Sequence, residues 1–264
     1  MIAGKTQRQE AIGLRVLSGL SILVVLCSWF ALSQSGLVSK MMLPSPAEVA
    51  LTFVKSFQTP FAGATLSQHL VASLGRFLTG FLLAVCLGVP TGLLMGWIAP
   101  VRYAINPFFE TFRFIAPLAW VPFAALWFGT GIGGPILIVF SGAFAAAVIN
   151  TFEGARAADP RLIEACRTLG ASSWRVVVDV LIPSALPSIM AGVRIAAALG
   201  WQSLIGAELI VASSGVGYLI VQGQGSVETA IVMAGMTTIG IVGLLMDKGL
   251  AALERLASRH WRAA

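Results

Sequence analysis

The chain has 264 residues, of which 57% are hydrophobic and 11% are charged, and its mean hydropathy is +0.89. Soluble domains carry about 25% charged residues, so this composition excludes an ordinary soluble protein and predicts an integral membrane protein. The net charge of +6 would suit a nucleic-acid partner, but the basic residues lie between apolar runs, where the positive-inside rule explains them.

Six apolar runs approach the length of about 20 residues that crosses a bilayer as a helix. We therefore predict an all-α membrane protein with six transmembrane helices in a single domain over 1–264. The first run follows three basic residues, as in a signal peptide, but no cleavage site of small residues is evident, so we favour a retained helix. The predicted spans are 16–32, 69–97, 107–128, 133–151, 185–212 and 229–251.

The basic residues between the runs predict the orientation of the chain. With the N-terminus in the cytoplasm, nearly all of them fall inside, so both termini are expected to be cytoplasmic and the protein multi-pass. The inside residues are Arg102, Arg156, Arg161, Arg167, Arg175 and Lys248, together with Arg255, Arg259 and Arg262 in a cytoplasmic tail at 252–264. Lys40 and Lys55 are expected outside.

Segment 33–68 is expected outside the membrane. Ser45 can cap a helix that has Pro46 at its first position, and Val49, Phe53 and Phe57 recur at about helical spacing. We predict an amphipathic external helix that lies at the interface.

The second span, 69–97, carries two features with open interpretations. Gly88, Gly92 and Gly96 share one face and permit close approach of another backbone, either within this chain or in a second subunit. Arg76 lies near the outer end, where it would snorkel or attract an anion at the entrance, and we favour snorkelling.

The third span, 107–128, combines prolines with an acid–base pair. Glu110 and Arg113 are three residues apart and can pair on one helix face, which lowers the cost of charge near the interface. Pro117 frees backbone carbonyls and predicts a bend beside a translocation path. Trp120 and Trp127 are the aromatic candidates for lining that path.

The polar loop 153–184 lies between the fourth and fifth spans in the core segment 69–251. Asp159 followed by Pro160 predicts a helix start, and Gly170 predicts its end. A short helix with an exposed apolar face suits docking into a groove on a cytoplasmic partner. Its predicted apolar stripe consists of Leu162, Ala165, Cys166 and Leu169.

A second loop helix is expected over about 172–181, after which Pro183 and Pro187 break the chain as it re-enters the membrane. In the fifth span, polar groups at membrane depth are expected to face the bundle interior. They are Trp201, Gln202, Ser203 and Glu208.

Glu208 lies toward the outer end of that span, as a structural hydrogen-bonding partner or as part of an external gate, and we favour structure. The glycines in SSGVGYLI predict a turn or re-entrant loop before the last span.

Residues typical of enzymes are absent from the sequence. The string Gly4-Lys5-Thr6 lacks the earlier glycine and the strand of a phosphate loop, and no GxSxG, HExxH or CxxC motif is present. The three cysteines are not spaced as a disulfide framework or metal site. We therefore expect no catalysis and no metal site in this chain.

Residues 164–183 resemble the EAA motif of ABC importer permeases. Glu164, Ala165, Gly170 and Pro183 match the motif in place, while Cys166 replaces its second alanine. The resemblance implies a coupling helix that receives motion from an ATPase. The implied coupling residues are Glu164, Ala165, Cys166, Leu169, Gly170, Ala171 and Pro183.

The likeness covers nearly the whole chain and is similar to the nitrate, sulfonate and taurine branch of these permeases. It is carried by LPSP at 43–46, PLAWVPFAALWFGTG at 117–131 and GAELIVASSGVGYLI at 206–220, whereas Gly133-Gly134 departs from the branch. The resemblance implies a type I ABC importer permease fold and import of a small anion across the bacterial inner membrane.

The resemblance also implies the partners. They are a second permease copy in a homodimer, a separate cytoplasmic ATPase dimer that binds ATP and Mg²⁺, and a periplasmic or lipid-anchored solute-binding protein, with no cofactor in this chain.

Two rival functions stay open. An ion-coupled secondary transporter is disfavoured because no inverted halves with paired broken helices are evident, and a membrane-embedded enzyme or scaffold lacks clustered catalytic residues. Candidate residues of the translocation path or gate are Arg76, Pro117, Trp120, Trp127, Trp201, Gln202 and Glu208.

Overall fold

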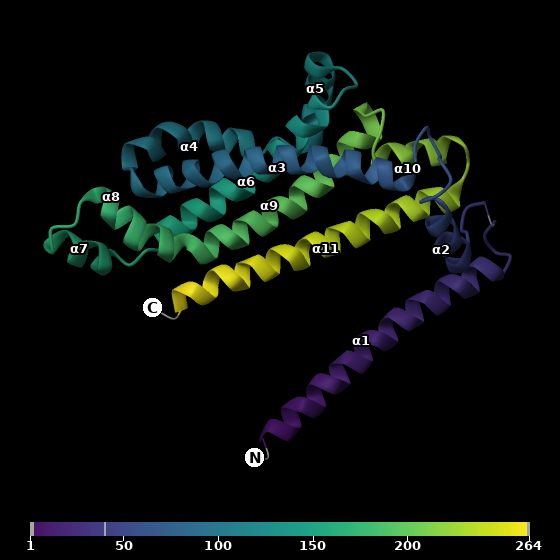
Figure 1. The fold of residues 1–264 in the computed structure, drawn as a ribbon, viewed down its shortest axis with the longest axis horizontal. Coiled ribbons are helices and arrows are strands. Elements are labelled where there is room, and N and C mark those ends of the chain that lie inside the picture. Colours follow the sequence, from purple (N-terminus) through teal and green to yellow (C-terminus); the bar gives the residue numbers. More distant parts are fainter. Residues whose placement is uncertain (1–2, 40, 263–264) are drawn as a thin grey trace.

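The computed structural model describes residues 3–39 and 41–262, and most of these are helical. Outside the described residues lie 1–2, Lys40 and 263–264, which belong to the predicted N-terminal, external and C-terminal segments. The side chains of 1–16, Ser18 and 257–264 are also not described. The helices form an elongated bundle with α3 (Leu66–Trp97), α6 (Gly133–Arg156) and α9 (Ile182–Val211) at its centre (Figure 1). Helix α11 (Thr229–Arg262) runs along one side.

The centre of the bundle is packed through small side chains. Ala84 of α3, Ala143 of α6 and Ala196 of α9 are each 0% exposed, and the rings of Phe77 and Trp201 meet edge to face beside them, with centroids 5.6 Å apart. In lipid, apolar surface alone does not drive helices together, so close backbone approach and van der Waals contact carry this association.

The glycine face of α3 packs against α6 of the same chain. A Cβ on Gly92 would lie 2.6 Å from the Val148 carbonyl oxygen, and one on Gly88 would lie 2.9 Å from Ala147 Cβ. The packing interpretation of these glycines is therefore confirmed, and the subunit-contact alternative is wrong because α6 occupies that face.

The third predicted span is two helices rather than one. Helix α4 (Ala99–Arg113) is followed by the 3-10 turn η1 (Pro117–Trp120) and α5 (Val121–Phe128), at an angle of 88°. The segment 107–128 is thus not one continuous helix but part of a bent pair that can count as one broken span, and the predicted bend at Pro117 is confirmed. Ala116 is driven out of the helical region (φ −57°, ψ 137°) because a residue before proline clashes with its ring. Figure 1 shows α5 turning away from the bundle.

Four or five of the described helices have the length and composition of membrane spans, compared with the six predicted. Among residues 3–39 and 41–262, four helices are long and apolar enough to cross a membrane, or five if the bent pair is one span. The four are α3, α6, α11 and the continuous helix Ser173–Val211. The first predicted span falls within α1 (Ala3–Gln34), a helix of 32 residues whose side chains are described without a gap from Gly19 onward.

Helix α2 (Pro46–Lys55) begins as predicted. Ser45 accepts a hydrogen bond from the Glu48 N–H, and the Glu48 carboxylate accepts one from the Ser45 N–H at 2.8 Å, which completes a capping box. Helix α1 projects away from the bundle (Figure 1) and is tied to the segment before α2 by a hydrogen bond from Trp29 Nε1 to the Pro44 carbonyl at 3.1 Å.

The polar loop contains α7 (Pro160–Thr168), α8 (Ser173–Val176) and a π segment, η2 (Val177–Leu181), that leads directly into α9. The predicted break at Pro183 and Pro187 is wrong. Pro183 lies in the first turn of α9, where its missing N–H is tolerated, and the wide π turn, in which the Ile182 N–H bonds to the Val177 carbonyl, carries the helix through.

A turn at 212–215 follows α9, and helix α10 (Val216–Gly225) then packs against α11. The predicted turn in SSGVGYLI is confirmed. The helix that follows it was not predicted.

We predict that Gly92→Ala destabilises the purified protein by about 1–3 kcal/mol, because the added methyl group overpacks the α3–α6 contact. The control is Gly75→Ala on the same helix, whose Cβ would meet no atom within 4 Å and which should raise stability slightly through helix propensity. Thermal unfolding in detergent measures both. Equal behaviour of the two variants would contradict the close-packed interface.

Candidate functional site

The polar loop 153–184 contains α7, and this helix begins and ends where the sequence predicts. Asp159 caps α7, with its Oδ1 accepting from the Arg161 N–H at 2.9 Å. Gly170 follows the helix with a φ of +83°, a conformation that only glycine adopts at little cost. Both the predicted start and the predicted end of α7 are therefore confirmed.

Most of the apolar stripe of α7 lies exposed. Leu169 is 87% exposed and Leu162 is 53% exposed, whereas Ile163, on the other side of the helix, packs against Ala158 and Leu181. Leu162 and Leu169 are thus exposed, whereas Ile163 attaches α7 to the bundle.

The other motif residues divide between two places. Glu164, Ala165 and Gly170 are exposed, and Cys166 and Ala171 are half-buried. Pro183 lies apart from them, in the first turn of α9. The Arg167 guanidinium lies 5.7 Å from the centroid of the Trp97 ring at the end of α3, and this cation–π contact is a second attachment of α7 to the bundle.

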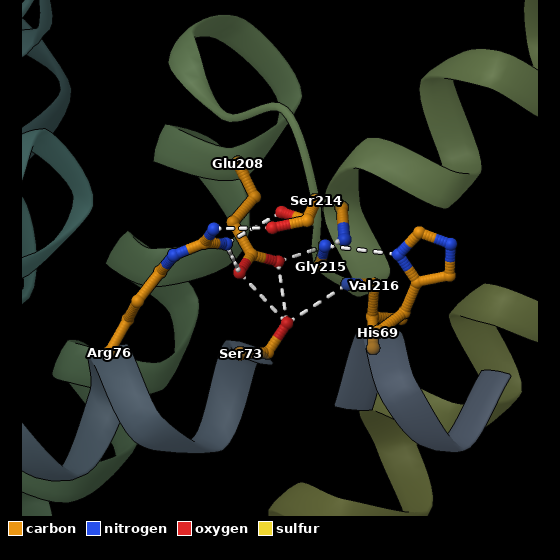
Figure 2. A network of polar contacts seen from close by, with 8 residues as sticks. His69, Ser73, Arg76, Glu208, Ser214, Gly215 and Val216 are labelled. Carbon is orange, nitrogen blue, oxygen red and sulfur yellow. Dashed lines mark hydrogen bonds and ion pairs between the residues drawn. The ribbon is translucent and has the colours of Figure 1, made fainter. Parts of the chain in front are cut away.

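At the opposite end of α9, Arg76 and Glu208 form a buried ion pair. Figure 2 shows Arg76 on α3 directed at Glu208 on α9, with Nη1 2.9 Å from Oε1 and side chains 6% and 0% exposed. Ser73, on the same helix as Arg76, donates to the carboxylate at 2.8 Å. A buried pair is stable only if its remaining donors and acceptors are also satisfied.

The turn after α9 supplies those remaining partners. Arg76 donates to the Ser214 carbonyl and to the Ser214 hydroxyl, each at 2.6 Å, and the Gly217 N–H donates to Glu208 Oε2 at 3.0 Å. The Val216 N–H donates to Ser73 Oγ at 2.9 Å. We call these residues, together with His69, the Arg76–Glu208 clamp, which fixes the turn that enters α10.

His69 extends the clamp by one residue. Its Nδ1 accepts from the Gly215 N–H at 3.1 Å, and its Nε2 lies 3.1 Å from the Phe61 carbonyl. A carbonyl can only accept, so Nε2 carries the hydrogen and the ring is neutral in this geometry.

These contacts decide between two of the alternatives left open by the sequence. Snorkelling is wrong for Arg76, because its guanidinium is buried and bonded inside the chain. The interpretation of Glu208 as a structural hydrogen-bonding partner is confirmed. Sequence reasoning missed His69, Ser73 and Ser214, although the spacing of 69, 73 and 76 places three polar side chains on one face of α3, and this was the available signal.

The remaining path candidates lie around two cavities. The bend cavity, of about 340 Å³, lies at the break between α4 and η1, where Pro117 and Gln202 border it. The α9–α11 cavity, of about 320 Å³, is bordered by Trp201 and, again, by Gln202. Gln202 does not face the bundle interior as predicted but is exposed beside both cavities.

Trp120 and Trp127 are placed elsewhere. Trp127 is 71% exposed on α5. Trp120 is half-buried between Phe112 and Phe123, and its Nε1 has no hydrogen-bond partner within the described part of the chain. Neither tryptophan borders the two cavities described above, so a role in lining the path stays a prediction for both.

Comparison with known proteins places the chain in a family. Residues 84–262 match the model of the binding-protein-dependent transport system inner membrane component. The chain belongs to this family, and the resemblance to ABC importer permeases is confirmed.

Relatives match over most of their length. The chain is 36% identical to the taurine transport system permease protein of Escherichia coli, over 89% of this chain and 86% of that protein. It is 35% identical to a putative aliphatic sulfonates transport permease protein of Bacillus subtilis, over 90% and 85%.

A solved structure of the MetNI methionine ABC transporter in an inward-facing conformation matches 73% of this chain and 95% of the matched chain, with a TM-score of 0.63 at 20% identity. The type I importer permease fold is therefore confirmed.

We predict that Glu208→Ala lowers the stability of the purified protein by about 3–5 kcal/mol, because it leaves Arg76 buried without a counter-charge. The control is Glu254→Ala, which removes a partly exposed carboxylate 3.8 Å from Arg194 and should have no measurable effect. Thermal unfolding in detergent compares them. A loss for Glu208→Ala no larger than for the control would contradict the clamp.

Proposed function

We propose that this chain is the permease subunit of an ATP-driven importer for a small anion and that α7 couples it to a separate cytoplasmic ATPase. The observation that carries the proposal is the apolar stripe of α7, which includes Ala165, Cys166 and Leu169 of the motif and in which Leu162 and Leu169 are exposed. An apolar helix face of this kind suits a hydrophobic groove on another protein.

The structure offers a mechanical route from α7 into the membrane. Beyond the turn at Gly170, α8 and η2 lead without interruption into α9, so that Ser173–Val211 is one helix of 39 residues. A displacement of α7 is therefore transmitted along α9 to the Arg76–Glu208 clamp. We infer that α7 receives the movement and that the bundle converts it into alternating access.

ATP hydrolysis belongs to the partner in this proposal, and the permease itself holds neither ATP nor Mg²⁺. To move a two-state equilibrium from 1:99 to 99:1, ATP binding must favour one state by about 5.5 kcal/mol. Two permease copies, two ATPase subunits and a solute-binding protein complete the importer. Both chain termini and α7 lie on the cytoplasmic side, and α2 lies on the outer side at the interface.

The solute class rests on the relatives, whose names refer to taurine and aliphatic sulfonates. We propose import of a small sulfonate or a related anion, such as nitrate. The candidate path residues keep the role assigned from sequence, except that Arg76 and Glu208 hold the outer turn in place.

Transport by the reconstituted complex tests the function. Proteoliposomes that contain the permease, its cognate ATPase and its binding protein should transport radiolabelled taurine or an alkanesulfonate only when ATP is present on the side of the membrane that carries the ATPase. Accumulation driven by a proton or sodium gradient without the ATPase would instead identify a secondary transporter.

We predict that Leu169→Asp abolishes solute-stimulated ATP hydrolysis while the permease stays folded, because Leu169 is 87% exposed and its replacement removes little buried surface. It is a cleaner test than Gly170→Asp, which would also strain a backbone with a φ of +83°. The ATPase rate of the reconstituted complex, and its assembly by size-exclusion chromatography, measure the effect.

The matched control is Thr168→Asp, which adds the same charge on the neighbouring exposed residue. It should retain most of the coupling if the apolar side chain is what docks. Wild-type coupling in Leu169→Asp would refute the assignment of α7, and an equal loss in both variants would show that charge, rather than the apolar contact, decides docking.

A further inference from the structure

The bend cavity lies where the third apolar segment is interrupted. Helix α4 ends at Arg113, and the chain restarts at Pro117 in a direction 88° away. Non-helical backbone at membrane depth is tolerated where it is covered by protein or lines a cavity, and Ile115 and Ala116 line this one. A volume of about 340 Å³ suits a small ligand.

Arg113 is the charged side chain among the residues that line the bend cavity, and its ion-pair partner Glu110 lines a separate cavity instead. The guanidinium uses Nε to donate to Glu110 Oε2 at 2.7 Å, while Nη1 and Nη2 donate no hydrogen bond within the described residues. Glu110 and Glu153 border a separate cavity of about 200 Å³ that Arg113 also lines. Arg113 therefore lines two cavities, one that also has acidic side chains and the bend cavity, which has none among its lining residues.

Neutral polar groups and apolar side chains complete the bend cavity. Ser141 and Ser203 donate to carbonyls of their own helices at 2.9 and 2.7 Å, which leaves their oxygen lone pairs free to accept. The Gln202 amide makes no hydrogen bond within the described chain and can donate to a ligand. The apolar part of the wall includes Ile115, Leu118, Ala145 and Leu199.

The α9–α11 cavity lacks this character, although it also contains an arginine. Arg194 is bound by Asp247 through two hydrogen bonds of 2.5 and 2.9 Å, and Glu254 lies 3.8 Å away. Its guanidinium is thus matched by two carboxylates. An anion would meet excess negative charge there, so the two cavities differ in the ligand they can hold.

We propose that the bend cavity binds a small alkanesulfonate, with its charged head on Arg113 and Gln202 and its short apolar tail against Leu118, Ala145 and Leu199. The proposal rests on the proposed function, because it places the imported solute in the membrane domain. It also specifies the class: the lining residues offer an ammonium group no carboxylate, because Glu110 lines the neighbouring cavity and is paired with Arg113, so a simple alkanesulfonate binds more tightly than an aminosulfonate.

Calorimetric titration of the purified permease in lipid nanodiscs with propane-1-sulfonate tests the site, with taurine as the comparison. Saturable binding of propane-1-sulfonate is expected, with taurine at least about tenfold weaker. Arg113→Gln should weaken binding by about 10- to 100-fold, the range for loss of a charge-assisted hydrogen bond.

Ala145→Leu serves as a second variant, because it fills the cavity without changing charge and should abolish binding. Arg194→Gln, in the other cavity, is the matched control and should bind within about twofold of the wild type. Thermal unfolding of each variant verifies that it is folded.

Absence of saturable binding to the wild type, or an equal effect of Arg113→Gln and Arg194→Gln, would overturn the site. Taurine binding as tight as propane-1-sulfonate would overturn the assigned class. Import of sulfonates by a complex whose permease fails to bind them would refute this inference and leave the proposed function standing. Sulfonate binding without ATP-driven import would refute the proposed function instead.

Discussion

The close contact between α3 and α6 sets the geometry of the whole bundle. Every fourth residue of α3 on this face is small, so the two backbones approach until the Gly92 position has no room for a Cβ. Because the hydrophobic effect does not drive helices together in lipid, this close steric fit is what stabilises the centre of the bundle. Helix α9 packs on the same pair, and the clamp, both cavities and the attachment of α7 all depend on that arrangement.

Polar groups occur in this bundle where the protein itself satisfies them. At the end of α9 farther from α7, Arg76 and Glu208 are bonded to each other, to Ser73 and to the turn that follows α9. At the bend, by contrast, the terminal donors of Arg113 remain available. The two arginines therefore have different roles: Arg76 uses its terminal donors within the chain, whereas Arg113 borders the bend cavity.

The sequence allowed the helices with long apolar runs to be predicted, together with the capping of α2 and α7, because those features depend on residues close in the chain. The partners of Arg76 could not be predicted, since Glu208 and Ser214 lie more than 130 residues away and their proximity comes from packing. The right angle at Ala116 was beyond prediction for a similar reason: proline indicates a bend but not its size. The exposure of Gln202 depends on how α9 is rotated within the bundle.

The π segment at 177–181 has a consequence for how this part of the chain can vary. A π turn accommodates one residue more than an α turn, and the five residues Val177–Leu181 have this conformation. A related chain that lacks one residue here could restore an ordinary α turn, which would rotate everything before it by about 100° around the axis of α9. The direction in which Leu169 points therefore depends on the helical phase across this five-residue segment as well as on the contacts of Ile163 and Arg167 that attach α7 to the bundle.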